Sequence, residues 1–221
     1  MKNAVFLLIA VLGVLELAVG QETITQNSVF AVGKINPSWS YQAETHFVRG
    51  DFLKEARQYI LRPSATFSLS KHVEVSGGIS YLYNASYSDG PSAASEEFNS
   101  WEQVGVHHNL GRLNFFHWVR TEQRHNVSGY SQRLRYRITL STPLELFAGL
   151  RFDAISFNEH FVSTKNMSFD GFDQNWTFVG VQFPIGEHLM FRSGYRHTLA
   201  RRGGENIHLN TLQSWLIVKV L

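Results

Sequence analysis

Ser131-Gln-Arg-Leu-Arg-Tyr-Arg-Ile-Thr-Leu140 carries the clearest indication of fold in this 221-residue chain. Within it, Arg133, Arg135 and Arg137 alternate with apolar side chains. Successive side chains of a β-strand point to opposite faces, so a strand formed here has one cationic face and one apolar face. Such a strand suits a membrane barrel, in which the outer wall is apolar and the interior is polar.

The same period-two alternation recurs along most of the chain, and no long stretch has the period of an amphipathic helix. It predicts ten strands, at Trp39–Arg49, Gln58–Leu69, Val73–Tyr83, 100–109, 112–124, 131–140, Leu144–Phe157, 174–183, His188–His197 and 208–221. The apolar stretch Ser28–Lys34 falls outside this count. It is either half of a further strand pair or a segment inside the barrel. We therefore expect an all-β fold, a closed antiparallel up-and-down transmembrane barrel of 10 to 12 strands.

The connections between these strands alternate between short and long. Short turns are predicted at Asn36–Ser38, Ser70–His72, Leu110–Gly111, Ser141–Pro143 and Ile185–Glu187. Long polar stretches lie between them, at Gly50–Arg57, Asn84–Asn99, His125–Tyr130, Asn158–Phe172 and Leu199–Asn206. Short turns at one end and long loops at the other are typical of outer-membrane barrels.

Residues 1–20 have the features of a cleaved signal peptide, with Lys2, an apolar run over Ala4–Leu15, and small residues at Ala18 and Gly20. Residues 21–221 are then expected to form one barrel domain. After Gly20, no run approaches the ~20 apolar residues of a membrane-spanning helix, so a membrane could be crossed only by strands. The chain has no cysteine, which argues against a disulfide-stapled secreted domain.

The polar faces of the predicted strands carry the main candidates for function. Nine arginines and five acidic residues are expected to line the lumen: Arg62, Arg120, Arg124, Arg133, Arg135, Arg137, Arg151, Arg192 and Arg196, with Glu44, Glu74, Glu122, Glu145 and Asp153. Two interpretations are open. The excess of arginine could attract small anionic solutes into a narrow pore. Alternatively, the charges could pair with one another in an interior that side chains fill.

Other residue types leave further alternatives open. Phe116 and Trp118 fall on a polar face and could belong to a lumen plug or to an interface band. The five tryptophans could form membrane-interface girdles, or they could fill the core of a soluble periplasmic lipocalin-like ligand-binding barrel. In that soluble fold, the apolar faces would point inward and the arginines outward.

Enzymatic and metal-binding functions have weaker support. Glu159, His160 and Ser163 lie close in one predicted loop, as in a lipid-modifying or hydrolytic outer-membrane enzyme, but a triad is defined by geometry. Among ten histidines, the neighbours His107 and His108 should face opposite ways, and no metal-ligand spacing is present. We expect no cofactor, no metal and no catalytic activity. A net charge of +2 does not indicate nucleic-acid binding.

Several segments resemble a family of Gram-negative outer-membrane barrels that is described only as a domain of unknown function, of the 2490 type. The resemblance rests on Gln132–Leu146, Ser156–Phe161, Phe169–Asn175 and Arg192–Tyr195, and it extends over Trp39–Leu221. It implies a β-barrel in the outer membrane and no established activity. The expected function is thus a structural barrel or passive, porin-like narrow pore, with outer-membrane lipids, lipopolysaccharide and the barrel assembly machinery as partners.

Overall fold

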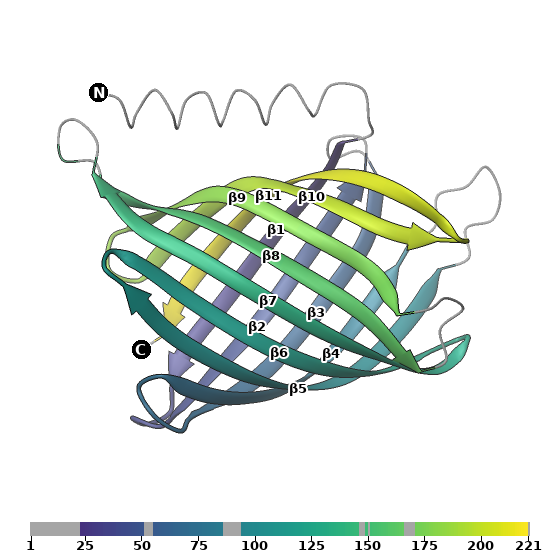
Figure 1. Cartoon of the computed structure of the whole chain (residues 1–221), viewed down its shortest axis with the longest axis horizontal. Coiled ribbons are helices and arrows are strands. Elements are labelled where there is room, and N and C mark those ends of the chain that lie inside the picture. The colour runs from purple at the N-terminus through teal and green to yellow at the C-terminus, as the bar shows by residue number, and fades with distance from the viewer. Residues whose placement is uncertain are drawn as a thin grey trace.

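The chain forms a closed β-barrel in the computed structural model, which describes residues 23–50, 55–85, 94–145, 149, 151–165 and 171–220 (Figure 1). The predicted signal peptide lies outside these residues. Eleven strands make up the wall: β1 (Thr23–Lys34), β2 (Trp39–Gly50), β3 (Glu55–Ser68), β4 (Val73–Asn84), β5 (Ser95–Leu110), β6 (Leu113–Asn126), β7 (Gly129–Glu145), β8 (Arg151–Lys165), β9 (Phe172–Ile185), β10 (Leu189–Arg202) and β11 (Glu205–Val220). The all-β barrel fold predicted from the alternation is therefore confirmed.

The strand count is odd, and this changes how the barrel closes. Neighbouring strands are antiparallel except at the seam, where β1 lies between β2 and β11 and runs parallel to β11. The stretch Ser28–Lys34 belongs to β1, so it is a single wall strand, neither half of a further pair nor a segment inside the lumen. The expectation that every neighbouring pair is antiparallel is wrong at this seam. A parallel pair also satisfies its backbone hydrogen bonds, and it removes the need for an even number of strands.

Four of the five predicted short turns are confirmed, and their sequences explain them. The side-chain oxygen of Asn36 accepts hydrogen bonds from the backbone N–H groups of Ser38 and Trp39, both at 2.9 Å. Gly111 and Gly186 follow the ends of β5 and β9 with φ values of 60° and 68°, which glycine adopts without strain. These interactions fix the short connections at one end of the barrel.

The turn predicted at Ser141–Pro143 is wrong, because β7 continues through Pro143 to Glu145. Pro143 is opposite Asp153 of β8, whereas the pairing of β7 with β6 ends at Ser141. Its missing N–H therefore removes no ladder bond on the β6 side, and the strand tolerates the proline. As a result, Leu144 and Glu145 end β7, and the strand predicted at Leu144–Phe157 begins only at Arg151.

Strands also extend into stretches that were expected to be long loops. β8 continues to Lys165, well beyond its predicted end at Phe157. β6 and β7 are joined through Val127 and Ser128 alone, and β10 and β11 through Gly203 and Gly204. In these extensions the apolar residues do not follow period two, since Phe161 and Val162 are adjacent in β8, so the sequence pattern does not mark them as strands. At the end where long loops were predicted, longer strands therefore replace part of the loops, and two of the connections there are short.

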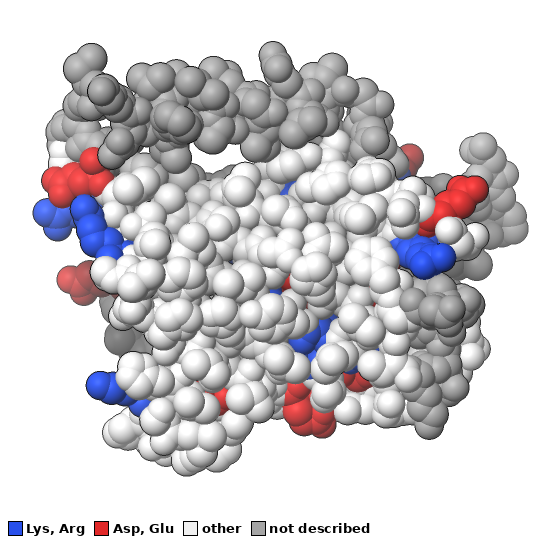
Figure 2. Space-filling view, in the orientation of Figure 1, with Lys and Arg blue, Asp and Glu red and all other residues white. Residues whose placement is uncertain are grey.

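The outer wall of the barrel is predominantly apolar. Large hydrophobic side chains are exposed on strand after strand, including Leu61 (54%), Val104 (51%) and Val119 (45%). Figure 2 shows one face of the molecule, where charged side chains gather mainly towards the two ends and the lower edge. No helix in the described part of the chain is long and apolar enough to cross a membrane.

Candidate functional site: the charged interior

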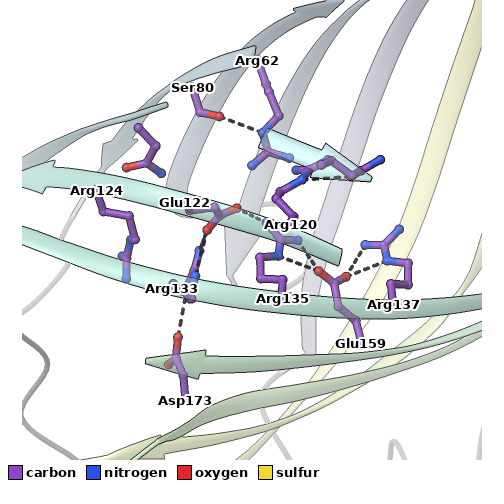
Figure 3. Close-up of polar contacts among 12 residues, drawn as sticks. Arg62, Ser80, Arg120, Glu122, Arg124, Arg133, Arg135, Arg137, Glu159 and Asp173 are labelled. Atoms are coloured by element: carbon purple, nitrogen blue, oxygen red, sulfur yellow. Dashed lines mark hydrogen bonds and ion pairs between the residues drawn. The ribbon is translucent and has the colours of Figure 1, made fainter. Parts of the chain in front are cut away.

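The candidate site is the interior of the barrel, where charged side chains from several strands converge (Figure 3). Twelve of the fourteen residues predicted to line the lumen point inward, and the remaining two differ. Arg151 and Glu145 form a weak pair at 3.5 Å at the end of the wall, with side chains 79% and 55% exposed. Both residues are in register with the inward-facing residues of their strands. However, Arg151 is the first residue of β8 and Glu145 is the last residue of β7, so both lie at the rim of the barrel. These two residues are therefore not part of its buried interior.

A continuous chain of ion pairs follows the inward face of β7. Arg133 donates to Glu122 at 2.9 and 2.6 Å and to Asp173 at 3.2 Å. Arg135 bridges Glu122 and Glu159, with an Nε–Oε1 distance of 2.7 Å to Glu159. Glu122 and Glu159 are thus each shared between two guanidinium groups, whereas Asp173 accepts one hydrogen bond from Arg133.

Strand register explains why the chain of ion pairs is continuous. Glu122 of β6 is directly opposite Arg133, and Glu159 of β8 is directly opposite Arg137, which donates to it at 2.7 Å. The direct neighbours of Arg135 are Arg120 and Phe161, so Arg135 reaches diagonally to both carboxylates. Glu122 and Glu159 are 2% and 0% exposed, and both are fully paired.

Two further groups of charges lie inside the barrel. Glu44 contacts Arg62 at 3.3 Å and His46 at 2.9 Å, and Arg62 also donates to the hydroxyl of Ser80 at 2.9 Å. Arg124 forms a two-point contact with Glu97, at 2.9 and 2.6 Å. A planar guanidinium that faces a carboxylate in this way holds both side chains in one orientation.

Three inward arginines are held by amide oxygens and aromatic faces. Arg120 donates to Gln103 at 2.7 Å and lies 3.8 Å from the Trp101 ring centroid. Arg192 donates to Gln182 at 2.7 Å, and Arg196 donates to Gln26 at 3.0 Å. Arg192 lies over the Trp215 ring and Arg196 over the Trp176 ring, at 4.4 and 4.0 Å. The ring faces supply the partial negative charge that a carboxylate would otherwise provide.

The sequence prediction missed three acidic residues of the interior, namely Glu97, Glu159 and Asp173. Glu97 and Glu159 lie in stretches that the sequence predicts as long loops, and Asp173 precedes the predicted start of its strand. In the described part of the chain, eight inward arginines (Arg62, Arg120, Arg124, Arg133, Arg135, Arg137, Arg192 and Arg196) face seven carboxylates (Glu44, Glu74, Glu97, Glu122, Asp153, Glu159 and Asp173). The excess of four positive charges counted from the sequence therefore falls to one.

Aromatic side chains fill the part of the interior that faces the arginines. Phe157, Phe178 and Trp215 form a buried cluster together with Ile155. The guanidinium of Arg137 lies 4.1 Å from the Phe157 ring centroid, so the aromatic and charged parts are in contact. Trp118, which the sequence placed on a polar face, points inward and is 5% exposed, which favours the plug alternative for this residue.

Buried side chains pack tightly against one another on the side of the barrel formed by β8, β9 and β11. Phe178, Glu159 and Thr211 are each 0% exposed, although they come from three different strands. A water-filled pore would leave its lining side chains accessible to solvent. The middle of the barrel is instead packed with side chains, as expected for a barrel of this small strand number.

The interior does not bring together the residues considered for catalysis or for metal binding. Glu159 points inward, whereas His160 is exposed on the outer face of β8, so these two cannot belong to one catalytic triad. His107 and His108 likewise face opposite ways, with His107 contacting Glu74 at 3.2 Å. Within the described residues, no three histidine or acidic side chains are placed to hold a metal ion.

The fold and the site define a closed β-barrel with a predominantly apolar outer face and a paired, charged interior. Within that class, the chain belongs to the family described as "Protein of unknown function (DUF2490)", whose model matches residues 26–208. The matched region extends from β1 into β11 and contains the whole chain of ion pairs. No curated protein and no solved structure matches the chain.

Proposed function

We propose that this protein is an integral outer-membrane β-barrel with a structural role. Residues 1–20 direct its export as a signal peptide and are then removed by cleavage. The observation that carries this proposal is the inverted polarity of the wall. Leu61, Ile79 and Val104 are exposed at mid-strand, while Glu122 and Arg135 are buried inside. A soluble protein rarely exposes so extensive an apolar surface, whereas a lipid bilayer favours it.

Outer-membrane lipids and lipopolysaccharide are the proposed partners of the apolar wall. The barrel assembly machinery is the proposed partner during insertion, because a strand-rich membrane protein needs its wall closed before the backbone meets lipid. Neither proposal involves a cofactor or a nucleic acid.

Of the structural and pore versions of this role, the packed interior favours the structural one. Eight arginines and seven carboxylates leave little net charge to attract anions. The buried aromatic cluster around Phe178 and Trp215 occupies the space that a solute would need. Passage of small anionic solutes therefore belongs to the pore version, which the packed interior favours less.

Reconstitution into planar bilayers tests the structural version directly. We expect no steady single-channel conductance from the wild-type barrel. The double variant Phe157→Ala/Phe178→Ala should produce conductance, because it removes two rings from the cluster that fills the interior. Steady conductance of the wild-type protein would contradict the packed interior and restore the pore.

Membrane insertion has its own test, which is independent of conductance. The protein should resist extraction by salt and alkaline buffer, require detergent, and migrate differently on gels before and after heating. Release of the protein by salt alone would contradict the outer-membrane proposal and favour the lipocalin-like alternative. The positions of Arg133 and Arg135 inside the barrel, opposite to their expected place in a soluble barrel, argue against that alternative.

A further inference from the structure

One cluster of polar residues on the outer face of β10 and β11 has the form of a chelating site. His197 and His208 project from the outer faces of these neighbouring strands, and their ring nitrogens Nε2 and Nδ1 are 3.1 Å apart. The two residues are diagonal neighbours, since His197 is opposite Asn210 and His208 is opposite Leu199. His208 is exposed and His197 partly exposed, so an ion could reach both rings.

The protonation of His197 follows from its contact with Asn210. The Asn210 side-chain oxygen lies 3.2 Å from His197 Nδ1 and accepts a hydrogen bond from the Tyr195 hydroxyl at 2.5 Å. Because an amide oxygen can only accept, His197 Nδ1 carries the ring proton. The lone pair of His197 is therefore on Nε2, the nitrogen that faces His208.

The contacts around His197 match those of a metal-ligating imidazole. Such a histidine usually donates its second N–H to a carbonyl or carboxylate, which fixes the tautomer and the ring orientation. Asn210 has this role here, and it is itself 2% exposed and held by Tyr195. The orientation of the ligand nitrogen is thus established by the buried Asn210 and its bond to Tyr195 before any ion binds.

We propose that His197 and His208 together bind one divalent transition-metal ion on the outer face of the barrel. Imidazole nitrogens bind zinc at about 2.0–2.1 Å, so nitrogens 3.1 Å apart would subtend roughly 100° at the ion. This angle lies between those of octahedral and tetrahedral coordination. On binding, the proton of His208 Nδ1 moves to its Nε2, and the exposed ring turns to direct its lone pair at the ion.

Two imidazoles without a carboxylate favour copper, nickel or zinc over calcium or magnesium, and Cu²⁺ binds most strongly in this series. The site lies on the part of β10 and β11 nearest the Gly203–Gly204 turn, at the end opposite the short turns. It is independent of the packed interior and of the proposed structural role.

The structure also supplies a matched control on another part of the wall. His108 and His117 lie on the outer faces of β5 and β6, again as a pair from neighbouring strands. Their rings are stacked 5.0 Å apart with an interplanar angle of 13°, so the faces of the rings, and not their nitrogens, oppose each other. This pair should not chelate an ion in the arrangement that the structure has.

The test is titration of the detergent-purified, tag-free protein with Cu²⁺, followed by calorimetry and electron paramagnetic resonance. We expect one saturable site with two coordinated nitrogens. His197→Gln and His208→Gln should each weaken binding by at least about tenfold, the lower limit for loss even of a supporting partner. The double variant His108→Gln/His117→Gln should bind like the parent protein.

Heat-modifiable gel mobility of each variant will show that its barrel is intact. Absence of saturable Cu²⁺ binding by the parent protein would overturn the proposal. So would unchanged affinity in the His197 and His208 variants, or an equal loss in the His108/His117 double variant. None of these results would affect the proposed structural role, which conductance and detergent extraction test separately.

Discussion

Glu159 illustrates how strand register determines the role of a single side chain. It is opposite Arg137 and diagonal to Arg135, and it is fully buried and shared between both guanidinium groups. A buried charge that loses its partner keeps its desolvation penalty, so removal of one shared carboxylate leaves two arginines undercompensated. This makes Glu159 the most sensitive position of the ion-pair chain.

The substitution Glu159→Gln should lower the free energy of unfolding by about 3–5 kcal/mol, the range for breaking a buried ion pair. Glutamine keeps the shape, but its NH₂ group would face a guanidinium that can only donate. Urea unfolding in lipid vesicles measures the effect. Glu145→Gln is the matched control at the exposed pair with Arg151, where we expect a change within about 1 kcal/mol. Equal effects of both substitutions would show that the interior charges are hydrated.

The sequence could assign the direction of most charged residues, but not their pairing. Period-two alternation placed Arg133, Arg135 and Glu122 inside because their strands carry an apolar opposite face. Glu159 was missed because β8 reverses this rule: Phe157 and Phe161 are buried inside, while Asn158 and His160 are on the outer side. Such a strand resembles a polar loop unless its partner strands are known.

At the scale of whole strands, β9 and β10 approach each other through a pair of glycines. Gly180 and Gly194 are directly opposite in the register, and the Phe178 ring lies over both. A Cβ atom added at Gly194 would lie 2.3 Å from the Val179 carbonyl oxygen and 2.5 Å from Phe178 Cζ. The backbone oxygen cannot move without disturbing the ladder, so this contact requires glycine.

We therefore expect Gly194→Ala to destabilise the barrel by about 3 kcal/mol or more, at the upper end of the range for overpacked cores. Gly77→Ala is the matched control, because its added Cβ would meet only the Trp101 carbonyl oxygen, at 3.7 Å. Alanine there should be neutral or slightly stabilising, since it restricts the unfolded chain. The fraction of heat-modifiable protein after refolding compares the two variants, and similar yields would contradict the close packing of β9 on β10.

At the scale of the whole molecule, the closure of the barrel could not be predicted from the sequence. Alternation shows that Ser28–Lys34 suits a strand, but it contains no information on which strands are neighbours. The seam between β1 and β11 joins the first and last described strands over eleven register pairs, from Thr23 with Asn210 to Gly33 with Val220. Such a contact has the largest sequence separation in the barrel, so its loop-closure cost makes it a late step in folding.

An odd number of strands also places the two ends of the barrel wall at opposite rims. β1 begins at the rim of the Gly203–Gly204 turn, whereas β11 ends at the rim of the short turns (Figure 1). If the short turns face the periplasm, as is usual for outer-membrane barrels, Thr23 at the start of β1 lies at the cell-surface rim. In an even-stranded barrel with the same turns, both ends of the wall would face the periplasm.

Epitope insertion tests this topology in intact cells. A short epitope between Glu22 and Thr23 should be bound by antibody without permeabilisation, as should one between Gly203 and Gly204. An epitope at Gly186, in the turn between β9 and β10, should be bound only after the outer membrane is permeabilised. Gly186 and Gly203 both have positive φ in exposed turns of two or three residues. Insertions at the two positions should therefore disturb the stability of the barrel to a similar extent. If the epitope before Thr23 were hidden while the one at Gly203 was accessible, β1 would not run parallel to β11, and the barrel would have to close through a different pair of strands.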